Sequence, residues 1–423
     1  MEMKKILVKN AKVVFPGHEL NGETTNIEIV EGVITAIGNI SPSDHHVVEH
    51  DGLMVSPGWV DMLANLRDPG SEHKETIQSG LDAAARGGFT KVLVSPDTQP
   101  PIASKAQVEY ILGKAQGHVV EALPAAALSA DMAGSDLAEL FDMHQAGAVA
   151  FTDVTHPVSS GLLNRALQYT QDMGGRILSY PVDPDMGSNG QVNEGRASVL
   201  TGMKAIPSIA EESGIDRELN LLAYNGGNLH FHLISSAGSV ERIRKAKAQG
   251  LNITCSVSWM HLCFDEETVL DFDQQYKVYP PLRSSAYREA LIAGVADGTI
   301  DVICTNHLPE DIENKDVEFE QAAFGVRGLE GFYGALKTYT NGAISDDRLI
   351  DAISLAPRRI LRLESPKILE NSPADLTLFC ADDRWTFTKD HVRFGYANTP
   401  LIGKELTGKV IGVITDVDGY LND

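Results

Sequence analysis

The chain has 423 residues, of which 43% are hydrophobic and 22% are charged, values that are ordinary for a soluble globular protein. Its 58 acidic and 35 basic residues give a formal net charge of −23, and such a surface repels nucleic acid and anionic lipid. We therefore expect neither nucleic acid nor a membrane among its partners. No apolar run approaches the roughly 18 residues that span a bilayer, and the first residues, MEMKKILV, do not have the pattern of a signal peptide.

The cysteine pattern indicates the cellular compartment. The four cysteines are Cys255, Cys263, Cys304 and Cys380, and no two of them form a C-x-x-C pair. Such spacing favours buried or reduced thiols over a disulfide framework or a cysteine-rich metal site. We therefore expect a cytoplasmic protein.

The two ends of the chain have the same character. Residues 1–54 alternate short apolar runs with polar turns, for example at 26–30, and this spacing predicts short antiparallel strands. Residues 365–423 repeat the pattern, for example at 408–415. Because neither end is long enough for an all-β domain, we expect the termini to meet in one small β-sandwich.

Between residues 55 and 364 the pattern changes to alternating helices and strands. Residues 73–86 have the apolar spacing of a helix with one buried face, and 89–94 follow as a buried strand. Later in the chain, Ser239 is placed to cap a helix that precedes a strand at 251–257. Repeated βα units predict a parallel sheet with helical cover. No glycine-rich nucleotide loop follows an early strand, so we predict a (β/α)8 TIM barrel rather than a doubly wound sheet.

Residues 57–70, PGWVDMLANLRDPG, closely resemble the segment that opens the barrel of dihydroorotases, P-G-[FW]-[IV]-D-x-H-x-H-L-R-[ED]-P-G. Further segments in the same order, including GGFTKV at 87–92, AFTD at 150–153 and PPLR at 280–283, extend the resemblance over nearly the whole chain. It is strongest to the zinc branch with an aspartate in place of a carboxylated lysine. The resemblance implies an amidohydrolase-type barrel, a role in pyrimidine biosynthesis, and zinc-dependent hydrolysis of dihydroorotate.

Most of the family's metal-ligand positions carry other residues in this chain. In chain order, these vestigial positions are Leu63, Asn65, Asp153, Tyr180, Leu233 and Asn306. Only Asp153 keeps the family residue, and Asn306 replaces the aspartate that is both ligand and base. Leucine has no lone pair, amide and phenol oxygens are poor zinc ligands, and a carboxamide takes no proton near neutral pH. We therefore predict a metal-site-deficient homologue with no cofactor and no intact catalytic residue.

The positions at which the family binds its anionic substrate are also changed. The three positions that hold the carboxylate of dihydroorotate fall on Arg67, Asp97 and Glu310. Two carboxylates repel an anion by about 1–4 kcal/mol each at plausible separations. We expect Arg67 to pair with one of them in a vestigial pocket.

The remaining histidines offer an alternative metal site. His230 and His232 are two residues apart on a predicted strand, so they share one face. Together with Asp153 and His307, they have the imidazole and carboxylate groups that a relocated metal requires. Against this, the family's ligand position aligns with Leu233 rather than with either histidine.

Three functions therefore stay open. The first is a pseudoenzyme with a scaffolding or regulatory role in pyrimidine biosynthesis. It forms a homo-oligomer and has aspartate transcarbamoylase as the partner to test first, because inactive dihydroorotase-like chains of this family assemble with that enzyme. The second is an active cyclic-amide hydrolase that converts dihydroorotate to N-carbamoyl-aspartate at a relocated metal site. The third is a metal-free protein that binds a small cationic or neutral ligand.

Overall fold

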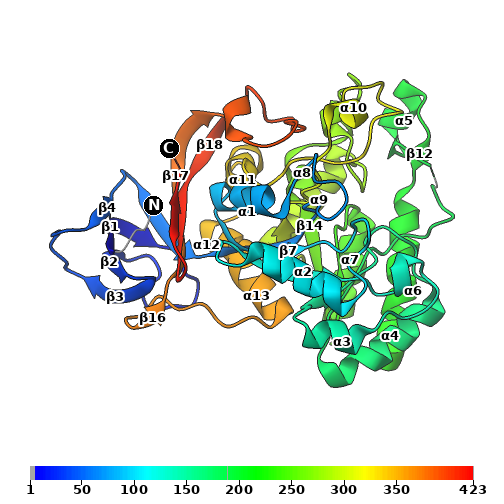
Figure 1. Cartoon of the computed structure of the whole chain (residues 1–423). Coiled ribbons are helices and arrows are strands. Elements are labelled where there is room, and N and C mark those ends of the chain that lie inside the picture. The colour runs from blue at the N-terminus through cyan, green and yellow to red at the C-terminus, as the bar shows by residue number, and fades with distance from the viewer. Residues whose placement is uncertain (1–4, 188, 423) are drawn as a thin grey trace.

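The computed structural model describes residues 5–187 and 189–422. It consists of a barrel of eight parallel strands and a separate sheet built from both ends of the chain (Figure 1). The predicted TIM barrel with a small β domain formed by the two termini is therefore confirmed.

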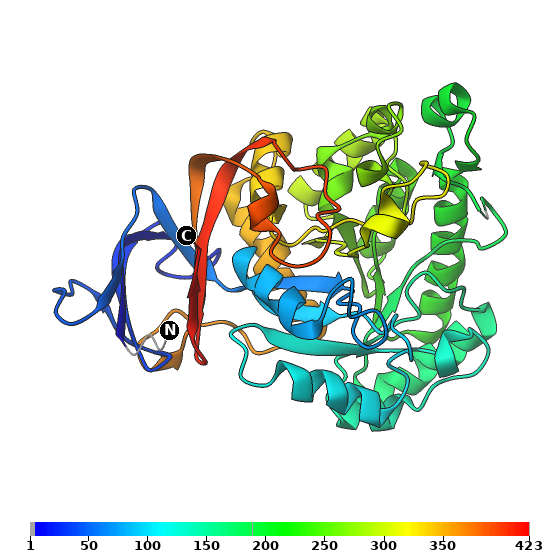
Figure 2. The same ribbon diagram turned by 45° about the horizontal axis from the view of Figure 1, so that its top comes forward.

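The separate sheet has nine strands. They are β1 (Lys5–Val13), β2 (Thr24–Val30), β3 (Val33–Gly38), β4 (His46–Val48), β5 (Leu53–Pro57), β16 (Ser372–Pro373), β17 (Asp375–Thr386), β18 (Glu405–Thr415) and β19 (Gly419–Leu421). β5 pairs with β17 in antiparallel register, with Met54 opposite Phe379, so the two ends of the chain meet as predicted. In Figure 2, β17 and β18 lie between the N-terminal strands and the barrel.

The barrel strands follow one another in chain order. They are β6 (Trp59–Ala64), β7 (Phe89–Val94), β8 (Glu121–Ala126), β9 (Ala150–Phe151), β10 (Ile177–Ser179), β13 (Leu229–Phe231), β14 (Ile253–Ser258) and β15 (Val302–Cys304). The last strand lies beside the first, where the Thr305 amide donates to Asp61 over 2.7 Å. Alternate side chains such as Val60, Leu93 and Val302 pack together in one buried cluster, as expected for a filled barrel interior.

Helices lie on the outside of the strands (Figure 1). They are α1 (Ile77–Arg86), α2 (Lys105–Ala115), α3 (Leu140–Gln145), α4 (Ser160–Met173), α5 (Arg196–Thr201), α6 (Ser208–Asn225), α7 (Ala237–Ala248), α8 (Trp259–Cys263), α9 (Ser285–Ala296), α10 (Ile312–Lys315), α11 (Phe332–Thr340), α12 (Asp346–Ile350) and α13 (Ala356–Leu361). Two short strands, β11 (Val192–Asn193) and β12 (Ala205–Ile206), flank α5. Within the described residues, no helix has the length and apolarity needed to cross a membrane.

Capping residues set the helix boundaries more finely than the apolar pattern does. α1 begins at Ile77 rather than at residue 73, because Thr76 accepts a hydrogen bond from the Ser79 amide and closes a capping box. α7 is capped by Ser236, whose hydroxyl accepts from the Ser239 amide over 3.0 Å. The expectation that Ser239 is the cap was therefore wrong, since Ser239 already lies in the first turn.

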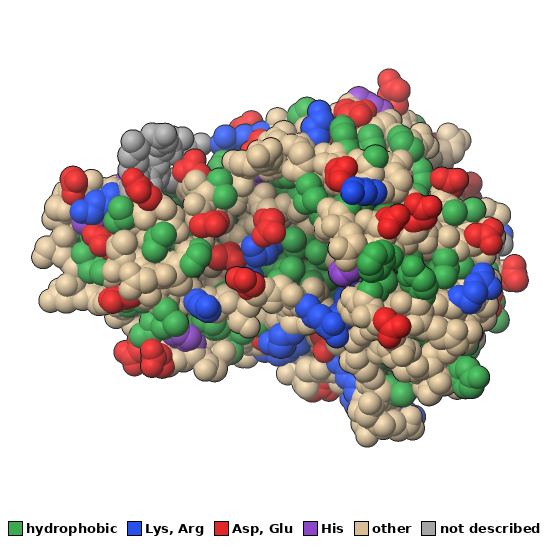
Figure 3. All heavy atoms as spheres, turned by 60° about the horizontal axis from the view of Figure 1, so that its bottom comes forward, with side chains coloured by type: hydrophobic (Ala, Val, Ile, Leu, Met, Phe, Trp, Pro, Cys, Tyr) green, Lys and Arg blue, Asp and Glu red, His purple; other side chains and the backbone are tan. Residues whose placement is uncertain are grey.

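Acidic and basic side chains are scattered over the face shown in Figure 3, and hydrophobic side chains lie in a hollow near its centre. The net charge of −23 is therefore not gathered into a single acidic patch on this face. Dispersed charge of this kind favours solubility over recognition of one basic partner.

Candidate functional site

The carboxyl ends of the barrel strands surround a cavity of about 320 Å3. Five of the six vestigial ligand positions line it, namely Leu63, Asn65, Tyr180, Leu233 and Asn306. Tyr279 and Phe324 complete an aromatic wall that the sequence interpretation missed. The available signal for Tyr279 was its place directly before the segment PPLR at 280–283.

The backbone is strained where the vestigial positions enter the cavity. Leu63 has φ 101°, Leu233 has φ 59° and Asn306 has φ 48°, all in the left-handed region. Leu63 also lies at a bulge in the pairing of β6 with β7. A bulky leucine rarely adopts this conformation, and such strain is concentrated at functional sites. The strand ends thus keep an unusual shape although their side chains offer few ligand atoms.

At two vestigial positions, an asparagine side chain forms hydrogen bonds with the backbone. The Asn65 side chain donates to the Asp97 carbonyl over 2.8 Å and accepts from the Arg67 amide over 2.9 Å. The Asn306 side chain donates to the Tyr279 carbonyl over 3.2 Å. Both asparagine side chains therefore stabilise the neighbouring backbone through hydrogen bonds.

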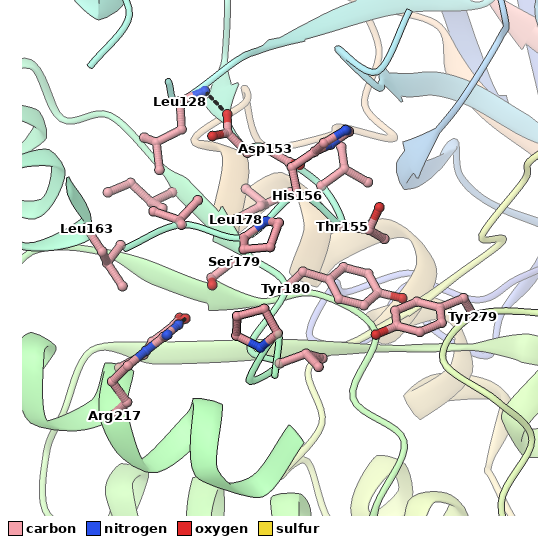
Figure 4. A pocket seen from close by; sticks show the side chains of 17 residues that line it. Leu128, Asp153, Thr155, His156, Leu163, Leu178, Ser179, Tyr180, Arg217 and Tyr279 are labelled. Atoms are coloured by element: carbon pink, nitrogen blue, oxygen red, sulfur yellow. Dashed lines mark hydrogen bonds and ion pairs between the residues drawn. The ribbon is translucent and has the colours of Figure 1, made fainter. Parts of the chain in front are cut away.

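Asp153 is the one vestigial position with its family residue, and its carboxylate is already used. It accepts from the amides of Leu128 and Ser129 over 2.8 and 2.9 Å and from the Ser129 hydroxyl. Burial raises its pKa against the effect of these hydrogen bonds. Figure 4 shows the carboxylate turned toward Leu128, in a neighbouring cavity of about 170 Å3.

Of the residues proposed for a relocated metal, His232 and His307 line one cavity and the rings of His230 and His232 lie 6.4 Å apart, but the four form no single donor cluster among the described residues. His230 lines a third cavity beside Asn252 and Asp301, which directly precede β14 and β15, so it lies at the opposite end of the barrel from the mouth. His232 lines the mouth, where its Nδ1 lies 3.0 Å from the Ser256 hydroxyl.

His307 is held in a buried ion cluster. Its Nε2 lies 2.6 Å from Glu75, and its Nδ1 accepts from the Gly328 amide over 3.2 Å, so both ring nitrogens are engaged. Arg327 donates to the other oxygen of Glu75 over 2.6 Å. Burial alone raises the pKa of Glu75, but His307 and Arg327 together hold it below its usual value.

Among the described residues, three potential metal donors lie within 4.8 Å of one another only at His50, Cys380 and Asp383, in the terminal sheet. The Cys380 sulfur is 3.3 Å from Nδ1 of His50, whereas Asp383 is 3.4 Å from Nε2. The two partners therefore face opposite ring nitrogens and do not converge on one point.

The expected pairing of Arg67 is confirmed. Its guanidinium forms an ion pair with Glu310 and also donates to the Pro309 carbonyl over 2.8 Å. The other oxygen of Glu310 accepts from Lys74 over 2.6 Å. Arg67 is thus neutralised within the protein. Asp97 lines the cavity, half-buried, and its carboxylate has no hydrogen-bond or ion-pair partner within residues 5–187 and 189–422.

Burial favours the neutral form of two ionisable rings in the cavity, His232 and Tyr180. Burial lowers the pKa of His232 to about 3 and raises the pKa of Tyr180 well above its usual value. The Tyr180 hydroxyl oxygen is buried without a partner among the described residues. Tyr180 stacks on Tyr279 with ring centres 5.6 Å apart, and the two rings lie side by side in Figure 4.

Comparison with known proteins agrees with this architecture. A family model described as dihydro-orotase-like matches residues 52–239. A dihydroorotase of Syntrophus aciditrophicus (strain SB) is 37% identical over 414 residues, which covers 96% of this chain and 97% of the relative. A dihydroorotase of Caldanaerobacter subterraneus subsp. tengcongensis is 37% identical over 412 residues, with 96% and 95% covered.

A solved L-hydantoinase (dihydropyrimidinase) from Arthrobacter aurescens has the same fold, with a TM-score of 0.84 at 21% identity over 100% of this chain and 98% of that chain. This likeness extends to the terminal sheet as well as the barrel, since the whole chain is covered. From the identity to curated relatives along almost its whole length, the chain belongs to the dihydroorotase family of amidohydrolases.

Proposed function

We propose that this chain is a catalytically silent dihydroorotase homologue, a pseudoenzyme with a scaffolding or regulatory role in pyrimidine biosynthesis. The observation that carries the proposal is the state of the six vestigial ligand positions. Leu63 and Leu233 have no donor atom, both asparagines are tied to the backbone, and Asp153 is held by Leu128 and Ser129. Such residues do not fit a catalytic zinc, which takes imidazole and carboxylate ligands.

The loss of the donor set removes the chemistry of the family mechanism. Zinc lowers the pKa of bound water from about 15.7 to about 7, so its loss reduces the supply of hydroxide by roughly eight orders of magnitude. Asn306 does not replace the missing base, because a carboxamide takes no proton near neutral pH. An anionic substrate also meets the unpaired Asp97, while Arg67 is committed to Glu310. These features support binding or assembly rather than hydrolysis.

A scaffolding role is supported by the intact frame and by a projecting lobe. The lobe consists of β11, α5 and β12 at the edge of the barrel (Figure 1), and Val199 and Leu200 on it are 81% and 58% exposed. Exposed apolar side chains that lie together favour contact with another protein. Aspartate transcarbamoylase is the partner that we propose, together with a homo-oligomer of this chain.

The absence of hydrolysis is tested by measuring metal content and turnover on the same preparation. We expect no stoichiometric zinc, manganese or iron, and no interconversion of dihydroorotate and N-carbamoyl-aspartate in either direction. The Syntrophus dihydroorotase provides the positive control. Turnover at a rate comparable to that control, or one metal ion per chain located at the barrel mouth, would overturn the proposal.

The scaffolding role is tested by mixing the chain with aspartate transcarbamoylase from the same cell. We expect co-elution in size-exclusion chromatography and a change in the kinetics of that enzyme. Val199→Asp should weaken the complex because it places a charge in the apolar contact, whereas Asp172→Asn, an exposed change on α4, should not. A chain that elutes alone and leaves the enzyme unchanged would contradict this role.

A further inference from the structure

The cavity at the barrel mouth has the composition of a ligand site, although its metal donors are replaced. Its volume of about 320 Å3 falls within the range typical of small-molecule pockets. Its lining combines apolar and aromatic residues with polar residues such as Asp97 and His232. Pockets of this kind bury most of a small ligand and orient it through the polar groups.

The charge of the cavity excludes the family's anionic ligand. Of the described residues that line it, Asp97 is the only carboxylate, there is no lysine or arginine, and His307 faces Glu75. The nearest family cation, Arg67, forms an ion pair with Glu310, which also contacts Lys74, and Lys74 lies 3.9 Å from Asp311. An anion would therefore meet repulsion from Asp97 without a lysine or arginine in the lining to offset it.

The aromatic wall favours a ligand with a planar ring. Tyr180 and Tyr279 are stacked with an interplanar angle of 20°, and Phe324 meets Tyr279 edge-on at 5.7 Å. Aromatic faces attract both planar rings and cations. The buried Tyr180 hydroxyl has no partner among the described residues, so its hydrogen-bonding capacity is unused.

We propose that the barrel mouth binds a small organic cation with a planar apolar body, whose charge pairs with Asp97 and whose ring packs against Tyr180, Tyr279 and Phe324. This inference rests on the proposed absence of the metal, because an ion in the cavity would cancel the charge of Asp97. It does not depend on a protein partner. The preferred ligand is therefore positively charged, whereas dihydroorotate is negatively charged.

Three probes with one ring and different charges test the inference: benzylamine as the cation, benzamide as the neutral analogue and benzoate as the anion. Affinities are measured by calorimetry and by the shift in melting temperature of the full chain. We expect benzylamine to bind about tenfold more tightly than benzamide, and benzoate to bind most weakly, because one half-buried carboxylate attracts the cation and repels the anion.

Matched variants test whether Asp97 causes the preference for the cation. Asp97→Asn, which restores the family residue, should abolish the preference for benzylamine over benzamide while leaving benzamide binding within about twofold. Asp172→Asn removes the same charge from an exposed position on α4 and should change nothing. Phe324→Leu should weaken benzylamine and benzamide alike, because it removes part of the aromatic wall.

The inference is overturned if benzoate binds as tightly as benzylamine, if Asp97→Asn keeps the charge preference, or if no probe binds at about 10 mM, a concentration above the Kd of a weak fragment. Metal content and dihydroorotate turnover are measured on the same preparation. Zinc together with turnover would instead overturn the proposed function. A metal-free, inactive chain that prefers benzoate would overturn this inference alone.

Discussion

The cavity and the ion cluster of Glu75, His307 and Arg327 meet at His307, yet the two regions are built in opposite ways. In the cluster every charged group faces an opposite charge or a hydrogen-bond partner, and the side chains of all three residues are at most 1% exposed. In the cavity the ligand positions are apolar or neutral, and the polar groups of Asp97 and Tyr180 have no partner among the described residues.

This difference is consistent with the proposed loss of the metal site. A buried charge without a partner costs several kcal/mol, so a site that loses its ion must also neutralise or expose the charges around it. Arg67 pairs with Glu310, and Asp153 is held by backbone amides. Among the described residues that line the cavity, only Asp97, which is half-buried, has a carboxylate without a partner. Of the two unpaired groups, the Asp97 carboxylate is half-buried, whereas the Tyr180 hydroxyl is buried.

The largest change expected is the return of zinc. The variant combining Leu63→His, Asn65→His, Tyr180→His, Leu233→His and Asn306→Asp restores the family donors on strand ends that keep their strained backbone. We expect one zinc per chain, with an apparent binding free energy on the order of 10 kcal/mol. Metal analysis and competition with a chelator measure it. Asn65→His alone is the control and should bind no zinc, and failure of the full variant would show that side-chain loss is not the only barrier.

The ion cluster should be the more fragile region. Glu75→Ala leaves Arg327 buried without its carboxylate, so we expect a loss of about 3–5 kcal/mol in the free energy of unfolding. Glu109→Ala removes an exposed carboxylate that pairs with Lys105 and should cost at most about 0.5 kcal/mol. Urea denaturation measures both. Equal losses of unfolding free energy for the two variants would contradict the expected importance of the buried ion cluster.

Acid should destabilise the cavity wall through His232. Its pKa is about 3 in the folded protein, below the ordinary value of 6.5, so the unfolded chain takes up a proton that the folded chain does not. The stability contributed by the neutral ring is present above pH 6.5 and is lost as the pH falls toward 3. Between pH 7 and pH 5 we expect a loss of about 2 kcal/mol from this group. His232→Gln should reduce that part of the acid sensitivity, and an unchanged pH profile would contradict this account.

The smallest effect expected concerns the unpaired hydroxyl. Tyr180→Phe removes a buried group that has no partner in the described structure, so we expect a gain of about 1 kcal/mol or no change. Tyr110→Phe is the matched control, because its hydroxyl donates to Asp68 over 2.7 Å, and it should cost about 1 kcal/mol. Thermal melting distinguishes them. A clear loss for Tyr180→Phe would mean that the hydroxyl has a partner in solution.

Much of the fold was determined by local sequence. The period of the apolar residues predicted β2, β7 and α1, because strands and helices bury every second or every third to fourth residue whatever surrounds them. The ion pair of Arg67 was predicted because the resemblance places Arg67 and two carboxylates in one pocket, where opposite charges attract. The replaced ligands were visible as well, since the absence of a donor atom is a property of the residue type.

Only the tertiary structure decided where the remaining polar groups point. His230 and His232 share a strand face and their rings lie 6.4 Å apart, but they line different cavities because successive positions on one face of a strand lie at different depths. His307 is engaged by Glu75, which is 232 residues away in the chain. Tyr279 and Phe324 reach the cavity from outside the barrel strands. Direction and long-range partnership depend on how distant segments pack, and no local pattern contains that information.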